Sequence, residues 1–248
     1  MGLTAIVIRF CHRRIGKMKG ILDSGIQIHS PSFSGGLAFK KVAIIVVVEP
    51  AELVTLGRMV VGLTGGMGCG KSTASRMFEK RGFRRLDSDQ IVHDLLESDP
   101  ATIRKVVDVF GPKVISSNGG VNRSLLGSIV FGDDEKLKAL EDIMHPKVRE
   151  AWEGAVASDQ EANWILEIPL LFEKNLQNRV DFTICVFSDL NSQVERLEQK
   201  GIGRAQALAR INRQMPLSQK AENADFVLLN EGSLEFLEDQ IKTLLTRL

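Results

Sequence analysis

The sequence predicts an α/β fold in which helices flank a five-stranded parallel sheet. Short apolar segments typical of buried parallel strands alternate with helical patterns from residue 59 onward. A long helical stretch between two of these strands predicts an insertion at about 90–157. The 248 residues are 44% hydrophobic and 25% charged, which excludes a collagen-like or wholly disordered chain.

Five segments have the pattern of strands, four of them apolar and one, Phe83 to Asp87, ending in an acid, and turn or cap residues separate them from helices. The strands are predicted at 60–64, 83–87, 163–168, 182–187 and 225–229. Helices are predicted at about 72–81, around 91–96, at 99–110 and through most of 123–157. Breaks in the last stretch are predicted near Gly132 and at Pro146, and Asn118-Gly119 is typical of a hairpin.

Residues 1–58 differ in charge from the rest of the chain. They hold eight Lys/Arg and three Asp/Glu, a net charge of +5, whereas the remainder has a net charge of −4. The first 22 residues are basic and lack acids, as in a transit segment. Met59 directly precedes the first predicted strand, which favours an upstream start-site artefact or a nonessential extension. We expect no chemistry from 1–58 and a separate functional domain at 59–248.

Charge, hydropathy and cysteine usage restrict the partners. The net charge of +1 gives no basic field for nucleic acid. The longest apolar run, 42–48, has seven residues, where a membrane span needs ~20. Cys11, Cys69 and Cys185 stand far apart, which favours a reducing compartment. We expect a cytoplasmic protein without nucleic-acid or membrane partners; the oligomeric state stays open.

The strongest motif lies between the first predicted strand and the helix after it. It reads Gly65-Gly66-Met67-Gly68-Cys69-Gly70-Lys71-Ser72 and fits the phosphate-loop pattern G-x-x-x-x-G-K-[ST]. Its glycines let backbone N–H groups point at one anion, and the helix N-terminus adds its positive dipole end. The Lys71 ammonium group is expected between the β- and γ-phosphates, and the Ser72 hydroxyl is expected to bind Mg²⁺. Thr73 can reach the α-phosphate side. For Cys69, a loop-filling role is favoured over a redox role.

Other features favour a small-molecule kinase over a GTPase switch. The guanine-reading motif Asn-Lys-x-Asp is absent from the sequence, and the helical insertion suits a second substrate. Asp87-Ser88-Asp89 ends the second predicted strand, where a carboxylate can accept a hydroxyl proton during phosphoryl transfer. The alternative is that these acids cap the next helix. One acid can also cap while the other takes part in chemistry.

The phosphate loop and the motifs that follow it in the sequence resemble those of the dephospho-CoA kinase family. The resemblance is carried, in order, by 61–73, 87–93, His145-Pro146, 169–173, 210–214, Ala224-Asp225 and 230–232. It covers about 60–248, and Pro-Leu-Leu-Phe-Glu at 169–173 is much more specific than the phosphate loop. It implies a P-loop kinase that uses ATP with Mg²⁺ to phosphorylate the ribose 3′-hydroxyl of dephospho-CoA. The products would be coenzyme A and ADP, in the last step of coenzyme A synthesis.

The same resemblance implies roles for individual residues. Asp89 is the expected general base, with Asp87 as cap, and Arg210 is expected near the adenine or the phosphates. The expected acceptor-binding residues are Asp89, His93, His145, Leu170, Leu171, Phe172 and Glu173. His145 can equally be a structural histidine, and the apolar trio can be core instead of pocket lining.

A basic stretch at about 196–213 is interpreted as a lid over the phosphates. Its candidate cations are Arg196, Lys200 and Arg204, with hinge glycines between them, and a solvated basic face is the alternative. Family members often have Arg where this chain has Lys200, and Lys cannot make the bidentate fork. Glu167 is an unusual residue for a buried strand and is placed to orient Mg²⁺ through water.

Two other functions are compatible with the sequence. One is a nucleoside monophosphate kinase-like enzyme, which would use a different acceptor on the same fold. The other is a nucleotide-dependent switch that hydrolyses ATP slowly, which predicts no phosphorylated acceptor and a dispensable Asp89.

Overall fold

A computed structural model describes residues 5–8, 27–29, 43–46, 58–130 and 132–246 of the chain. Most of the segment interpreted as an N-terminal extension, Cys11 included, lies outside these described residues. Within the described part, no helix combines the length and the apolar character needed to cross a membrane.

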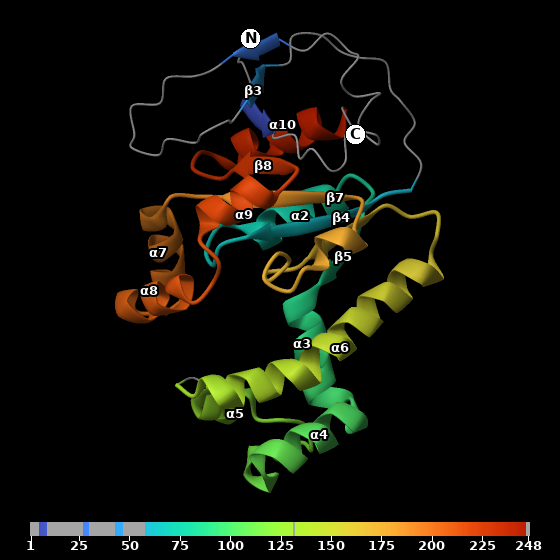
Figure 1. Ribbon diagram of the computed structural model, residues 1–248, viewed down its shortest axis with the longest axis vertical. Helices are drawn as coiled ribbons and strands as arrows, with labels where there is room; N and C mark the ends of the chain where they lie inside the picture. Colours follow the sequence, from blue (N-terminus) through green and yellow to red (C-terminus); the bar gives the residue numbers. More distant parts are fainter. Residues whose placement is uncertain (1–4, 9–26, 30–42, 47–57, 131, 247–248) are drawn as a thin grey trace. The chain divides into compact units, whose positions relative to one another are not determined.

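Five of the described strands form the predicted parallel sheet (Figure 1). They are β4 (Val60–Gly65), β5 (Arg84–Asp87), β6 (Trp164–Glu167), β7 (Phe182–Phe187) and β8 (Phe226–Leu229). Their order in the sheet is β8-β7-β4-β6-β5, so the strand before the phosphate loop is the central one. In this central strand, Val61 is in register with Phe182 on one side and with Ile165 on the other.

Three short strands near the N-terminus extend the sheet beyond β8, which the sequence analysis did not predict. They are β1 (Ala5–Ile8), β2 (Gln27–His29) and β3 (Ala43–Val46). β1 pairs antiparallel with β8, with Val7 opposite Val227. Because β8 would otherwise be an edge strand, its outer N–H and C=O groups are open to such pairing.

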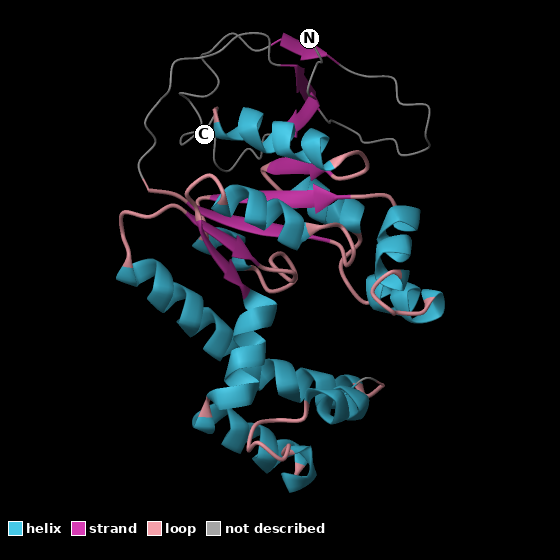
Figure 2. Cartoon of the chain, turned by 180° about the vertical axis from the view of Figure 1, so that it is seen from behind, coloured by secondary structure: helices cyan, strands magenta, loops and turns pink. Residues whose placement is uncertain are grey.

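The faces of the sheet follow from side-chain alternation along its strands. Val61 and Leu63 of β4 point into the main core, while Thr64 points to the opposite face, where a Cβ on Gly62 would meet Val180 and Leu171. The core face is covered by α2 (Lys71–Glu79) and α10 (Leu234–Leu245), and Figure 2 shows the sheet between its helices. The helix α9 (Leu217–Asn223) lies on the opposite face, against β4 and β7.

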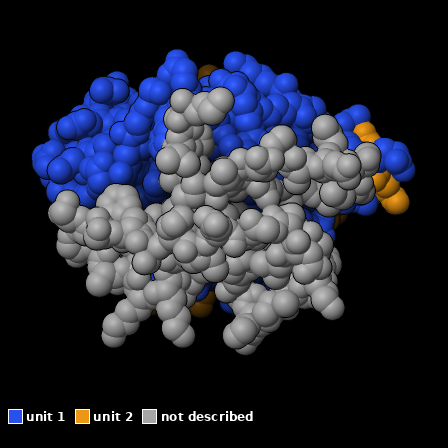
Figure 3. Space-filling model, turned by 90° about the horizontal axis from the view of Figure 1, so that it is seen from above, with its two compact units in different colours: residues 1–85, 161–248 blue, residues 86–160 orange. Residues whose placement is uncertain are grey.

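The chain divides into two compact units, coloured separately in Figure 3. The first holds Met1–Arg85 and Glu161–Leu248, and the second holds Leu86–Gln160. The second unit contains α3 (Ser88–Ser98), α4 (Pro100–Phe110), η2 (Pro112–Val114), α5 (Arg123–Val130) and α6 (Asp134–Ser158). Leu96, Val106 and Leu126 lie in its own hydrophobic core. That this unit binds the acceptor stays a prediction.

Two turn signals in the second unit have the predicted outcome, and one break was predicted wrongly. Gly111 follows the end of α4, and Ile115 pairs antiparallel with Val121 around the Asn-Gly turn. However, α6 continues through Pro146. Met144, Val148 and Trp152 are buried at four-residue spacing, so packing on one face keeps both halves aligned despite the hydrogen bond lost at proline.

Candidate active site

The loop between β4 and α2 has a backbone that requires glycine. Gly68 and Gly70 have φ angles of 79° and 89°, in the left-handed region. A Cβ atom on Gly68 would lie 2.5 Å from the backbone oxygen of Gln193, and one on Gly70 would collide with the amide of Asn230. The loop is therefore shaped by its own conformation and by close neighbours from α7 (Leu190–Glu198) and the end of β8.

The ammonium group of Lys71 folds back over this loop. Its Nζ donates hydrogen bonds to the carbonyl oxygens of Gly65, at 3.2 Å, and Gly66, at 2.9 Å. Lys71 is the first residue of α2, so a positive side chain and the N-terminal end of the helix dipole lie together. This combination favours an anion at the loop.

A buried carboxylate lies next to Ser72. The Ser72 hydroxyl donates a hydrogen bond of 3.0 Å to Oε2 of Glu167, the last residue of β6, which is 3% exposed. The guanidinium of Arg85 holds Oε1, with Nε at 2.7 Å and Nη2 at 2.5 Å, and the Ser75 hydroxyl also contacts this oxygen. These partners compensate for burial of the charge.

The oxygen atoms beside the loop suit a hard cation. Mg²⁺ prefers oxygen ligands, keeps several waters and often uses one or two protein groups together with substrate phosphates. The Ser72 hydroxyl and the Glu167 carboxylate are such groups and are within hydrogen-bond distance of each other. Their chemistry therefore fits Mg²⁺ brought with a nucleotide.

The outer side of the phosphate loop is held by Arg196 and Asn230. Arg196, on α7, donates to the carbonyl oxygens of Gly68, at 3.3 Å, and Asn230, at 2.7 Å, and to Ser188 Oγ, at 2.8 Å. The Asn230 side chain donates to Cys69 O at 2.8 Å. Hydrogen bonds thus connect the carbonyl groups of Gly68 and Cys69 to residues that follow β7 and β8. Arg196, a lid candidate in the sequence analysis, is directed at protein carbonyls and a hydroxyl.

Cys69 is enclosed within this arrangement. The residue is fully buried, and burial raises the pKa of its thiol, although the nearby Lys71 ammonium acts in the opposite direction. A thiol with a raised pKa stays protonated and unreactive near neutral pH. The structure favours the loop-filling role for Cys69.

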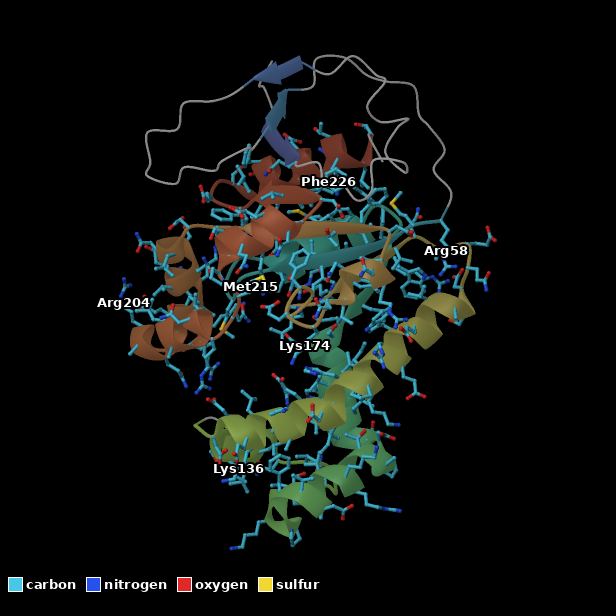
Figure 4. All side chains as sticks on the ribbon, in the orientation of Figure 1. Arg58, Lys136, Lys174, Arg204, Met215 and Phe226 are labelled. Carbon is cyan, nitrogen blue, oxygen red and sulfur yellow. The ribbon has the colours of Figure 1, made fainter. Side chains whose placement is uncertain are left out.

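The remaining basic residues of the proposed lid lie around α8 (Arg204–Asn212). Lys200 is exposed between α7 and α8. Arg204 begins α8 with its side chain 58% exposed, 3.9 Å from Glu198, and it is labelled in Figure 4. Arg210 is half-buried in the last turn of the same helix. Lys200 and Arg204 are therefore the candidates whose charge faces solvent.

The 169–173 segment follows β6 and divides between core and surface. Leu171 is fully buried and Phe172 is 7% exposed, whereas Leu170 is half-buried. Leu170 is therefore the member of the apolar trio that reaches the surface. Glu173 Oε1 accepts hydrogen bonds, while Oε2 is buried without a hydrogen-bond partner in the described part of the chain.

Within the second unit, Asp87 and Asp89 differ in environment. Asp87 is the N-cap of α3, and its Oδ1 accepts hydrogen bonds from the backbone N–H groups of Asp89, at 3.0 Å, and Gln90, at 3.4 Å. The Asp89 side chain is exposed in the first turn of the helix. The geometry gives Asp87 the capping role, and the role of Asp89 as general base stays a prediction.

The two histidines predicted to contact the acceptor also belong to the second unit. His93 lies on α3, with Nδ1 3.4 Å from Glu97 Oε2 and 3.6 Å from Asp94 Oδ1. His145 is half-buried on α6, one residue before Pro146. Their contact with an acceptor remains a prediction.

Comparison with known proteins identifies the family. Residues 59–235 match the family described as dephospho-CoA kinase. A dephospho-CoA kinase from Carboxydothermus hydrogenoformans is 40% identical over 192 residues, which are 76% of this chain and 93% of the relative. The chain belongs to the dephospho-CoA kinase family. It is accordingly a kinase of the nucleotide-binding transferase class.

Solved structures agree with this assignment of the fold. A crystal structure of a Thermus thermophilus protein has 34% identity and a TM-score of 0.67, and the match covers 78% of this chain and 99% of that one. A dephospho-CoA kinase from Campylobacter jejuni, at 24% identity and a TM-score of 0.54, has the same fold over 77% of this chain and 97% of its own. The predicted P-loop kinase fold is confirmed.

Sequence reasoning missed two charged residues in this dephospho-CoA kinase family member. Arg85 holds Glu167, and Lys220 holds Glu173. Arg85 lies within the predicted strand 83–87, where a basic residue in a covered sheet requires an acidic partner. The burial of Lys220 could not be predicted in this way, because the residue lies in a polar helical segment typical of a solvent-exposed surface.

Proposed function

We propose that this protein transfers the γ-phosphoryl group of ATP to the ribose 3′-hydroxyl of dephospho-CoA. The family match over 59–235 carries the proposal, and the phosphate loop with its Ser72–Glu167 contact supports it. A bond forms between the 3′-oxygen and the γ-phosphorus, and the bond from that phosphorus to the β,γ-bridging oxygen breaks. The products are coenzyme A and ADP.

The residues of the first unit bind and neutralise the phosphates. The loop N–H groups and Lys71 hold the β- and γ-phosphates, because glycine conformation and the helix N-terminus direct positive charge to one place. Ser72 and Glu167 would hold Mg²⁺, directly and through water. When bound, Mg²⁺ neutralises charge on the transferring phosphate. Arg196 and Asn230 keep the loop in its binding shape.

The acceptor hydroxyl requires a base that orients it and takes its proton. Asp89 is proposed for this role because the resemblance assigns it and because Asp87 already caps α3. A carboxylate suits this role, since the proton moves late in a loose transition state. Lys200 and Arg204 are proposed as the cations of a lid at about 196–213, and Arg210 as a nucleotide contact. His93, His145, Leu170 and Glu173 are proposed to bind the acceptor.

Product analysis tests the proposal. The purified protein is incubated with MgATP and dephospho-CoA, and the products are separated and identified by mass spectrometry. The expected product has one added phosphate that a 3′-nucleotidase removes, together with an equal amount of ADP. Phosphate on another position, or on nucleoside monophosphates instead, would assign the protein to another kinase type. ATP hydrolysis without a phosphorylated acceptor would favour a nucleotide-dependent switch.

A further inference from the structure

Lys220 is a charged residue with no exposed surface. It lies on α9, and its Nζ is 2.7 Å from the carbonyl oxygen of Pro169 and 2.8 Å from Oε1 of Glu173. Both partners belong to the 169–173 segment. Removal of an ammonium group from water is unfavourable unless it is paired and hydrogen-bonded, and these two contacts supply that compensation.

The partners of Lys220 connect three separate parts of the first unit. Glu173 Oε1 also accepts a hydrogen bond of 3.1 Å from the backbone N–H of Met215, which lies between α8 and α9 and is labelled in Figure 4. Pro169 O also accepts a bond of 3.2 Å from Thr64 Oγ1. Thr64 immediately precedes the first glycine of the phosphate loop. Lys220 therefore joins the 169–173 segment to the end of α8 and the start of that loop.

Stability alone does not require a buried ion pair at this place. Well-packed apolar residues of similar volume often stabilise a protein as well as a buried pair does. A buried pair instead penalises any arrangement that separates its partners, because each charge would be left uncompensated. The three segments are thus held in one mutual geometry.

We propose that Lys220 is a positioning residue for the acceptor substrate. It fixes the 169–173 segment and, through Glu173, the C-terminal anchor of the proposed lid, so that the acceptor is held in line with the γ-phosphate. This inference rests on the proposed function of the 169–173 segment and of 196–213. Small displacements at such a segment are costly, since about 1 Å can change a rate by about 100-fold.

The test compares steady-state constants of Lys220→Met with those of the wild type. Methionine keeps an unbranched side chain but has no ammonium group. We expect the KM for dephospho-CoA to rise at least tenfold, with or without a fall in kcat. The KM for ATP should change less than threefold, because Arg196 and Asn230 still hold the phosphate loop. Lys242→Met is the matched lysine control, because Lys242 is exposed on α10 and pairs with Asp239 at 3.3 Å.

A second control separates positioning from loss of stability. Ile241→Val removes a methylene group from the core beside α2 and lowers thermal stability away from the 169–173 segment. Each assay is run well below the melting temperature of the variant. If Lys220→Met raises the KM for dephospho-CoA no more than these control variants do, the inference is overturned. If the wild type does not phosphorylate dephospho-CoA at all, the proposed function fails instead.

A double variant keeps the test decisive if Lys220→Met does not fold. Lys220→Met with Glu173→Gln removes both charges together and leaves no uncompensated carboxylate in the interior. The same rise of at least tenfold in the KM for dephospho-CoA is expected relative to Glu173→Gln alone, because Glu173 is itself proposed to bind the acceptor. An unchanged KM in the folded double variant would overturn the inference.

Discussion

The hydroxyl of Ser72 donates a 3.0 Å hydrogen bond to Oε2 of Glu167, and this contact joins the first turn of α2 to the end of β6. The other carboxylate oxygen is anchored by Arg85 at 2.5 Å. One oxygen thus fixes the side chain, and the other orients the serine proposed to hold Mg²⁺. Groups that orient a metal ligand tune metal affinity without contacting the reacting atoms.

Glu167→Gln is expected to weaken Mg²⁺ use. The amide keeps the size of the side chain but loses the charge, so we expect activity at fixed Mg²⁺ to fall by about 10- to 100-fold. The Mg²⁺ concentration for half-maximal activity should rise in the same variant, which a titration measures. Glu238→Gln is the control, because Glu238 also pairs with an arginine, Arg81 at 2.6 Å, but on α10. Equal Mg²⁺ dependence in both variants would contradict the assigned role of Glu167.

Gly68→Ala is expected to abolish nucleotide binding. The added Cβ would lie 2.5 Å from the backbone of Gln193, at a φ of 79° that alanine rarely adopts. Binding of a fluorescent ATP analogue measures the loss. Gly154→Ala is the control, because Gly154 lies within α6 with no atom near its Cβ position. That change should stabilise the helix by about 0.5–1 kcal/mol and leave binding intact. Wild-type affinity in Gly68→Ala would refute the assigned loop geometry.

Arg196→Lys is expected to impair ATP use despite the retained charge. A lysine cannot reproduce the planar fork that bonds the carbonyls of Gly68 and Asn230 together with Ser188. Charged hydrogen bonds contribute about 1.5–3 kcal/mol each, so kcat/KM for ATP should fall by roughly tenfold or more. Arg204→Lys keeps the charge at an exposed position, so this variant should change kcat/KM for ATP much less. Full activity in Arg196→Lys would show that charge alone is needed at residue 196.

Asp189→Ala is expected to destabilise α7 in a pH-dependent way. Asp189 caps this helix, and hydrogen bonds from Ser192 lower the pKa of its carboxyl group. Loss of the cap should cost about 1 kcal/mol near neutral pH. Because the pKa is lower in the folded state, this stabilisation is present above the unfolded-state pKa of the carboxyl group. It disappears as pH falls through the folded-state pKa.

Urea unfolding of the wild type and Asp189→Ala measures this difference. At about pH 7 the two midpoints should differ, and the difference should shrink as the pH falls below the unfolded-state pKa of about 3.9. Asp239→Ala on α10 serves as a control for the removal of an exposed acid. A gap between the wild type and Asp189→Ala that stays constant with pH would contradict the capping role of the carboxylate.

The sequence predicted the elements that local patterns determine. The apolar runs located β4, β6, β7 and β8, the segment 83–87 located β5, and the phosphate-loop pattern located the start of α2 within one residue. That one of the acids at 87–89 caps a helix followed from local physics, whereas the choice of Asp87 and the fold family came from the family resemblance. The burial of Glu167 was visible as an acid within an apolar strand.

Features set by distant contacts were not accessible in this way. Lys220 meets Pro169 and Glu173 across more than forty residues of chain, and nothing in its own segment marks it as buried. Arg196 was predicted as a lid cation from its basic stretch alone. Its carbonyl partners, at Gly68 and Asn230, lie far away in the sequence and could not be foreseen. Pro146 predicted a helix break, but tertiary packing around Met144 and Val148 outweighed the local preference.

The most direct test of the central claim is ADP release from MgATP with and without dephospho-CoA, for the wild type and for Asp89→Asn. Asparagine keeps the shape of Asp89 but cannot take a proton, and a general base contributes about 10²–10⁴-fold. The account predicts ADP release that requires dephospho-CoA and falls by about this factor in Asp89→Asn. Slow ADP release that is unaffected by dephospho-CoA and equal in both proteins would contradict it.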